Sequence, residues 1–256
     1  MKTTNNTILI TGGGSGIGRG LAEAFHKLGN QVIIAGRGKK TLDETIAANP
    51  GMKSVTLDVS DPKSIQSFAE KVTTKDYPSL NVLINMAGMM QPENLLEEPF
   101  DLSTAEKTIT TNLLGPVRLT AALLPSLRTQ PRATIMNVSS GLAFVPLAMT
   151  PTYCATKAAI HSYTQSLRYQ LKSTKVEVVE LIPPYVQTTL MGDQMAEDPR
   201  AMPLKEFIDE VMSILQSQPD AKEVCVKNVY PLRFAAEQGQ EKYEEFFQTF
   251  NDSMHG

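Results

Sequence analysis

The segment Thr7-Ile-Leu-Ile-Thr-Gly-Gly-Gly-Ser-Gly-Ile-Gly18 joins an apolar, strand-like run to a glycine-rich turn, and a segment of helical period, Gly18–Leu28, follows it. Glycine lets the backbone turn sharply and approach a pyrophosphate closely, and the free N–H groups at the start of a helix attract its negative charge. The spacing of Gly12, Gly16 and Gly18 therefore predicts a dinucleotide-binding β-α unit. The alternative is a glycine-rich loop that only turns the chain.

Short apolar runs alternate with longer helix-period segments along the rest of the chain, which indicates repeated β-α units and a parallel sheet. The predicted strands are Thr7–Thr11, Gln31–Ala35, Lys53–Leu57, Asn81–Asn85, Ala133–Val138, Val176–Ile182 and a shorter one at Glu223–Val226. The predicted helices are Gly18–Leu28, Lys39–Ala48, one opened by Ser60-Asp61-Pro62, Ser103–Ser126 with a bend near Gly115-Pro116, Tyr153–Ser173, Met202–Ser217 and Gln240–Phe250. Since no repeat or linker divides residues 1–256, we expect one α/β domain, a doubly wound parallel sheet of the Rossmann type.

Composition and charge restrict the possible partners. The formal net charge of −3 argues against nucleic acid or an anionic membrane held by bulk charge. No apolar run approaches the roughly 20 residues of a membrane-spanning helix, and none resembles a signal peptide. Two cysteines, Cys154 and Cys225, cannot build a disulfide framework, and no Cys/His spacing suggests a metal. We expect a cytoplasmic protein without a metal.

The end of the second predicted strand bears on the choice of nucleotide. It reads Ile34-Ala35-Gly36-Arg37 and continues Gly38-Lys39-Lys40, without the carboxylate that would hold the ribose hydroxyls of NAD. Arg37 can bind a phosphate through paired, charge-assisted hydrogen bonds. The turn therefore favours NADP(H) over NAD(H), with a solvated basic loop as the alternative.

A possible acid–base pair lies in Tyr153-Cys-Ala-Thr-Lys157, where two side chains four residues apart share one helix face. A free tyrosine has a pKa of about 10, and a nearby ammonium lowers it. Such a pair alone is common on helix surfaces. Here Asn137-Val-Ser-Ser140 also places a hydroxyl at the carboxyl edge of the sheet, and Asn112 lies in a helical stretch before it.

These motifs together resemble the short-chain dehydrogenase/reductase family in its single-domain form, over residues 7 to 188. The shared motifs are TGGGSGIG at 11–18, Asp58-Val59, Asn85-Met-Ala-Gly88, Asn112, Ser140 and YCATK at 153–157. The NMAG turn, the run at 137–168 and the helix beginning Met202-Pro-Leu-Lys-Glu-Phe207 resemble the DltE-like reductases within it. A family does not determine a substrate.

The resemblance implies roles for four catalytic residues. Tyr153 exchanges a proton with the substrate oxygen, and Ser140, rather than Ser139, hydrogen-bonds that oxygen. Lys157 lowers the pKa of Tyr153 and holds the nicotinamide ribose, while Asn112 supports a water-linked proton path through Lys157.

The resemblance also implies a set of cofactor contacts. Asp58 and Val59 would contact the adenine, and Val186 and Thr188 the nicotinamide carboxamide. The full expected set is Gly12, Gly14, Ser15, Gly16, Ile17, Gly18, Arg37, Asp58, Val59, Asn85, Ala87, Gly88, Tyr153, Lys157, Pro183, Val186 and Thr188. The chain departs from the family at Met86, usually Asn, and at Pro184, usually Gly.

Apolar residues near the predicted strand ends suggest an adaptable substrate pocket: Met89, Met90, Leu142, Phe144, Met149, Tyr185, Met191 and Met195. Since no Arg or Lys is placed there to bind an anion, we expect a neutral, moderately apolar ketone, aldehyde or secondary alcohol. Residues 188–217 would form a flap and helix beside the substrate, with a plain surface connection as the alternative for 188–200.

The remaining features have ordinary explanations. His26, His161 and His255 have no metal-like companion and are interpreted as structural or surface residues. The helix Gln240–Phe250 either packs on its own domain or joins a subunit interface. The family resemblance implies a homodimer, with a homotetramer as the alternative. A non-catalytic nucleotide-binding regulator and a sugar-nucleotide epimerase are the competing functions.

Overall fold

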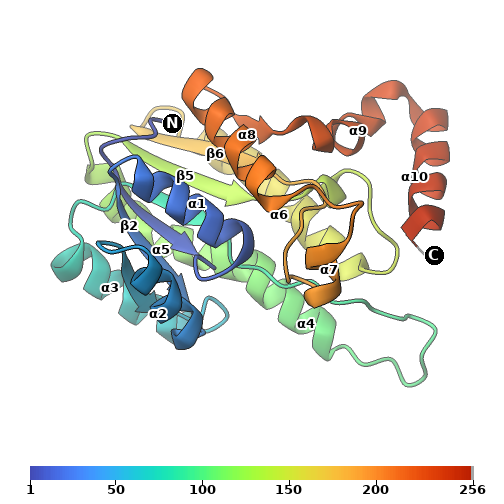
Figure 1. Cartoon of the computed structure of the whole chain (residues 1–256), viewed down its shortest axis with the longest axis horizontal. Helices are drawn as coiled ribbons and strands as arrows, with labels where there is room; N and C mark the ends of the chain where they lie inside the picture. Colours follow the sequence, from blue (N-terminus) through green and yellow to red (C-terminus); the bar gives the residue numbers. More distant parts are fainter. Residues whose placement is uncertain (255–256) are drawn as a thin grey trace.

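The computed structural model describes residues 1–254 and contains one sheet of parallel strands in the order β3-β2-β1-β4-β5-β6-β7 (Figure 1). The strands are β1 Thr7–Thr11, β2 Gln31–Gly36, β3 Lys53–Thr56, β4 Val82–Asn85, β5 Ala133–Val138, β6 Val176–Ile182 and β7 Glu223–Cys225. The order reverses between β1 and β4, which opens a crevice at the carboxyl edge of the sheet. The predicted doubly wound fold is confirmed.

The longer helices are α1 Gly16–Lys27, α2 Lys39–Ala48, α3 Pro62–Lys71, α4 Ser103–Ile109, α5 Gly115–Thr129, α6 Pro151–Gln170, α8 Leu204–Ser217 and α10 Gln240–Met254. Shorter turns are η1 Val72–Asp76, η2 Thr110–Leu114, η3 Gly141–Ala143, α7 Asp193–Glu197, η4 Lys227–Val229, α9 Tyr230–Arg233 and η5 Ala235–Gln238. Within residues 1–254 no helix is both long and apolar enough to cross a membrane.

Alternation along the strands builds two apolar layers, one on each face of the sheet. Ile8 and Ile10 of β1 join one core with α1, α2 and α8, whereas Leu9 joins the other with α3, α5 and α6. Both faces are therefore covered, which explains why most of the strands are apolar almost throughout.

The predicted helix Ser103–Ser126 is interrupted by the π-helical turn η2, which lies just before the predicted bend. Pro116 has no N–H to donate to the carbonyl of Asn112, so the regular helical ladder cannot continue through this point. The turn also lets Gly115 pack closely on Val59, where an added Cβ would lie 2.9 Å from the Val59 carbonyl oxygen. The proline and glycine thus explain the π-helical interruption and its position, and the bend near Gly115-Pro116 stays a prediction.

Candidate active site

A cavity of 850 Å³ opens at the carboxyl edge of the sheet. Its walls come from the turn after β1, the ends of β4 and β5, the start of α6, the segment after β6 and the C-terminal helix. The lining includes Tyr153, Lys157 and Ser140, together with the glycine turn. Residues from distant parts of the sequence therefore meet in one crevice at the strand-order reversal.

The turn at residues 12–18 is shaped for a close approach of the backbone. Gly12 has a φ of +68° and Gly16 a φ of +49°, both in the left-handed region that favours glycine. A Cβ on Gly18 would collide with the Gly12 carbonyl oxygen. Gly12, Ser15, Gly16, Ile17 and Gly18 line the cavity at the N-terminus of α1. This cradle of backbone and small residues suits a pyrophosphate.

The end of β2 presents a basic surface outside the cavity lining. Arg37 is exposed and, among residues 1–254, makes no hydrogen bond or ion pair, whereas Lys39 is bound to Asp43 at 2.5 Å. Arg37 lies close enough to Asp58 to help lower the pKa of that carboxyl, although the larger cause is the hydrogen bond from the Ser60 hydroxyl at 2.6 Å. An unengaged guanidinium at this edge is suited to a phosphate.

Several predicted cofactor residues lie deeper or farther along the edge than the cavity lining. Val59 packs beside Gly115, and Gly14 lies beside Thr41. Asn85 is buried, and its amide donates to Thr120 and to Asn137 at 3.1 and 2.8 Å. Ala87 and Gly88 line the cavity directly. Some of the expected cofactor residues therefore line the cavity, whereas others lie behind or beside its lining.

Tyr153 lies in the first turn of α6, and two features of the helix start set its position. Pro151 occupies the first helical position, and the Glu93 carboxylate accepts hydrogen bonds from the backbone and hydroxyl of Thr152 at 3.1 and 2.8 Å. The Tyr153 side chain is buried and hydrogen-bonded to Ser140. Burial raises the pKa of Tyr153 well above its ordinary value, and the bond with Ser140 opposes this rise.

Lys157 lies one turn beyond Tyr153 and is buried. Its Nζ donates to the Val138 carbonyl at 2.8 Å and lies 5.5 Å from the centre of the Tyr153 ring. Burial lowers the pKa of Lys157 to about 8, while the Glu180 charge acts in the opposite direction. At this separation the ammonium can favour the phenolate. Its effect on the Tyr153 pKa stays a prediction.

Asn112 lies in η2, and its side chain binds the backbone of the irregular segment that follows β4. It accepts from the Met89 N–H at 2.8 Å and donates to the Met89 carbonyl at 2.8 Å. An added Cβ on Gly88 would lie 3.4 Å from Asn112 Oδ1 and 3.9 Å from Lys157 Nζ. The structure thus brings Asn112 and Lys157 to the same glycine, next to the cavity.

The segment after β6 supplies the wall opposite the glycine turn. Pro183, Val186 and Thr188 line the cavity, as does Pro184. An added Cβ on Gly16 would lie 3.4 Å from Thr188, so the two walls nearly touch there. Val186 is held by a parallel bridge to Met202, just before α8.

Part of the cavity wall is apolar. Seven of the eight predicted pocket residues line it: Met89, Met90, Leu142, Met149, Tyr185, Met191 and Met195. Phe144 does not, and this prediction is wrong. Its ring instead packs edge-on against His161, with centroids 4.7 Å apart, and beneath Arg233.

The C-terminal helix contributes pocket residues that the sequence does not predict. Phe250 and Met254 line the cavity and pack on the cluster that contains Tyr153. The helix is held to its own domain by Asn251, which accepts from the Ala148 N–H at 2.6 Å and donates to the Pro146 carbonyl at 3.1 Å. The helix therefore packs on its own domain, as the first of the two alternatives predicts. Its apolar stripe was the available signal, but a stripe does not specify its contact surface.

Two residues of opposite charge, Asp198 and Arg200, line the cavity and form an ion pair with each other. Arg200 donates to Asp198 through Nε and Nη2, at distances from 2.8 to 3.2 Å, and Tyr185 donates to Asp198 at 3.0 Å. The Arg200 bonds are the main cause that holds the pKa of Asp198 far below its usual range. The sequence analysis did not predict Arg200 as a pocket residue. Its positive charge is balanced by the carboxylate of Asp198.

His161 lies beside two carboxylates that its sequence neighbours do not reveal. Its Nδ1 lies 2.9 and 3.0 Å from the two carboxylate oxygens of Glu180, and the ligand atoms of His161, Glu180 and Glu223 lie within 4.8 Å of one another. The prediction that it has no metal-like companion is therefore wrong, because β6 and β7 bring two carboxylates to this helix. His26 contacts the Pro50 carbonyl at 3.1 Å, and His255 lies outside the described residues.

Comparisons with known proteins agree with the predicted family. The family model for short chain dehydrogenases matches residues 6–199. A relative from Bacillus subtilis (strain 168), the "uncharacterized oxidoreductase DltE", is 40% identical over 98% of both chains. A short chain dehydrogenase from Burkholderia cenocepacia J2315 in complex with NADP has a TM-score of 0.80 at 24% identity, covering 96% of this chain and 98% of the other. One from Burkholderia phymatum in complex with NAD has a TM-score of 0.79 at 20% identity, covering 93% and 95%.

Proposed function

The chain belongs to the short-chain dehydrogenase family, and on that premise we propose that it is an NADP(H)-dependent oxidoreductase of a neutral ketone or aldehyde, or of the corresponding alcohol. The observation that carries this proposal is that Tyr153, Ser140 and Lys157 line the same cavity as the glycine turn. A proton donor and a nucleotide cradle facing one space suit hydride transfer at a carbonyl.

Tyr153, Ser140 and Lys157 have separate roles in the proposed reaction. A nicotinamide cofactor, when bound, supplies or accepts the hydride. Tyr153 gives its phenolic proton to the substrate oxygen during reduction and recovers it during oxidation. Ser140 donates a hydrogen bond to that oxygen and so stabilises the negative charge that develops there. Lys157 keeps a positive charge beside the phenol, which favours the phenolate left after proton transfer.

The glycine turn, Ala87, Gly88 and the segment Pro183–Thr188 would hold the cofactor along the crevice. The preference for NADP(H) rests on Arg37, whose guanidinium is exposed and unengaged at the end of β2. The two Burkholderia relatives carry NADP in one case and NAD in the other, so the side chains of this chain are the better guide.

A neutral substrate suits a pocket walled by methionines and aromatic rings. The cation at its mouth, Arg200, is already bound to Asp198. An anionic substrate would have to separate this pair, whereas a neutral carbonyl compound would only displace water from apolar side chains.

We also propose a homodimer, paired through the helical region of α5 and α6. The free thiols Cys154 and Cys225 suit the reducing cytoplasm.

Oxidation of NADPH and NADH against a panel of ketones, aldehydes and quinones tests the proposal. We expect turnover with at least one neutral carbonyl compound and a higher kcat/KM with NADPH. Tight binding of NADPH without turnover on any carbonyl compound would instead support a non-catalytic nucleotide-binding regulator.

A further inference from the structure

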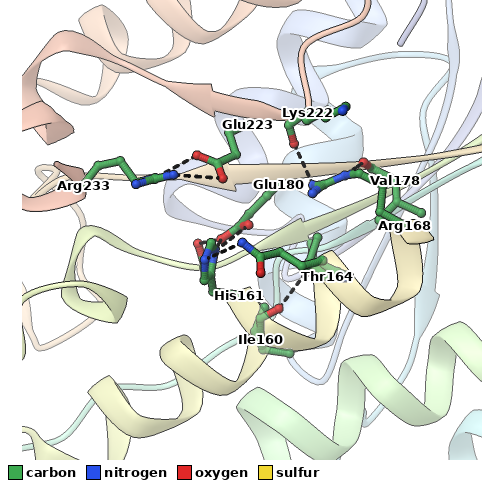
Figure 2. A network of polar contacts seen from close by, with 12 residues as sticks. Ile160, His161, Thr164, Arg168, Val178, Glu180, Lys222, Glu223 and Arg233 are labelled. Atoms are coloured by element: carbon green, nitrogen blue, oxygen red, sulfur yellow. Dashed lines mark hydrogen bonds and ion pairs between the residues drawn. The ribbon is translucent and has the colours of Figure 1, made fainter. Parts of the chain in front are cut away.

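A buried carboxylate lies directly behind the proposed catalytic residues. Glu180 on β6 is completely buried, and His161 from α6 points at it (Figure 2). Its carboxylate accepts from the Ser139 hydroxyl at 2.5 Å and from His161 Nδ1 at 2.9 and 3.0 Å. A charge removed from water is tolerated only when donors surround it, so these contacts are needed for its burial.

Ser139 connects this carboxylate to the sheet side of the site. Successive residues of an extended strand point to opposite sides, so Ser139 faces Glu180 while Ser140 faces Tyr153. The Ser139 N–H also donates to the Leu181 carbonyl at 3.0 Å. Backbone and side chain together fix the segment that supplies Ser140 and the carbonyl that binds Lys157.

His161 connects the same carboxylate to the helix side of the site. Tyr153, Lys157 and His161 follow one another at intervals of four residues, so they form one stripe along α6. The bond from His161 to Glu180 therefore resists rotation of α6 about its own axis. Such a rotation would move the phenol and the ammonium together, away from Ser140.

Arg233 binds Glu223 and not Glu180, so the Glu180 charge can still act on the pKa of Lys157. Glu223 on β7 is bound to Arg233 of α9 at 2.8 and 3.2 Å, separately from Glu180 (Figure 2). The Glu180 charge opposes the effect of burial on the Lys157 pKa. Although His161, Glu180 and Glu223 are close enough to hold one ion, Arg233 and Ser139 already occupy the two carboxylates.

We propose that Ser139, Glu180 and His161 form a positioning triad that holds Ser140 on the sheet in register with Tyr153 and Lys157 on α6. The Ser139 hydroxyl and the His161 ring both bind the Glu180 carboxylate, and the three residues act through the catalytic residues that they position. The proposal rests on the proposed function for its kinetic consequences, but not for its effect on Lys157.

Steady-state kinetics of substituted proteins tests the positioning. We expect Ser139→Ala, Glu180→Gln and His161→Leu to lower kcat by about 10- to 100-fold, because small displacements of reacting groups are costly. The KM for the carbonyl compound should change little. His161→Asn, whose amide can donate from the Nδ1 position, should retain most of the activity. Glu177→Gln removes an exposed carboxylate from the same strand and serves as the matched control.

A second readout does not require turnover. Reductive methylation of Lys157, followed by mass spectrometry across a pH series, reports where its amine loses the proton. Without the Glu180 charge, burial acts unopposed, so Glu180→Gln should shift the labelling midpoint to lower pH by about one unit. Ser139→Ala and Glu177→Gln should leave it near the wild-type value.

The triad is wrong if folded Glu180→Gln and His161→Leu proteins keep kcat within about twofold of wild type, or if Glu180→Gln leaves the labelling midpoint unchanged. If Glu180→Gln does not fold, Ser139→Ala and His161→Leu together decide the kinetic part. A wild-type protein that turns over no carbonyl compound refutes the proposed function, and the labelling series then decides the triad.

Discussion

Adjacent residues at the end of β5 have different partners because a strand alternates its sides. Ser140 reaches Tyr153 in the cavity, whereas Ser139 reaches Glu180 on the neighbouring strand. A similar distinction separates two basic residues after β2. Lys39 is bound to Asp43, and Arg37 is unengaged within the described chain. The role of a side chain thus depends on what its backbone position lets it reach.

Arg37→Ala tests the cofactor preference at this scale. Removing charge-assisted hydrogen bonds to a phosphate costs about 1.5–3 kcal/mol, or roughly a 10- to 150-fold weaker binding. We expect this loss for NADPH and little change for NADH, measured by titration of nucleotide fluorescence. Lys39→Ala is the control, since its ammonium is already paired. Equal losses for both nucleotides would refute the role of Arg37.

At the scale of elements, the local signals predict each β-α unit but not what distant elements bring to it. Strands β1, β5 and β6 and helix α2 have the predicted bounds, because apolar runs and the stop at Asn49-Pro50-Gly51 are encoded locally. The contacts of α10 with the pocket and of His161 with Glu180 depend on tertiary packing. A single sequence does not specify which surfaces meet, so neither contact was predictable, nor was the exclusion of Phe144.

Phe250→Ala tests the contribution of α10 to the pocket. The ring lines the cavity and packs on the cluster around Tyr153, so its loss should remove about 1.5 kcal/mol of apolar contact with a bound substrate. We expect a roughly tenfold lower kcat/KM for an apolar ketone, mainly through KM. Phe247→Ala is the matched control on the same helix, because that ring stacks on Tyr243 outside the cavity lining. Similar effects of the two substitutions would show that the helix acts only on stability.

At the scale of the whole molecule, the fold gathers into one crevice residues that are far apart in the sequence. The sheet order brings the ends of β1, β4, β5 and β6 together, and α6 crosses them with its Tyr153–Lys157 stripe. The meeting of Ser140, Tyr153 and Lys157 was predictable because their motifs lie at a strand end and on one helix face. The substrate was not, because the pocket combines residues from loops, α10 and the segment after β6.

The most direct test of the central claim is turnover by Tyr153→Phe, which keeps the ring but removes the proton donor. Carbonyl reduction should fall by about 100- to 10,000-fold, the usual contribution of a general acid. NADPH at about 100 times its Kd should still stabilise wild type and variant alike, by about 2.7 kcal/mol or roughly 5–10 °C in Tm. Lost turnover with a preserved thermal shift is the predicted result. Near-complete turnover in the folded, NADPH-binding variant would contradict the account.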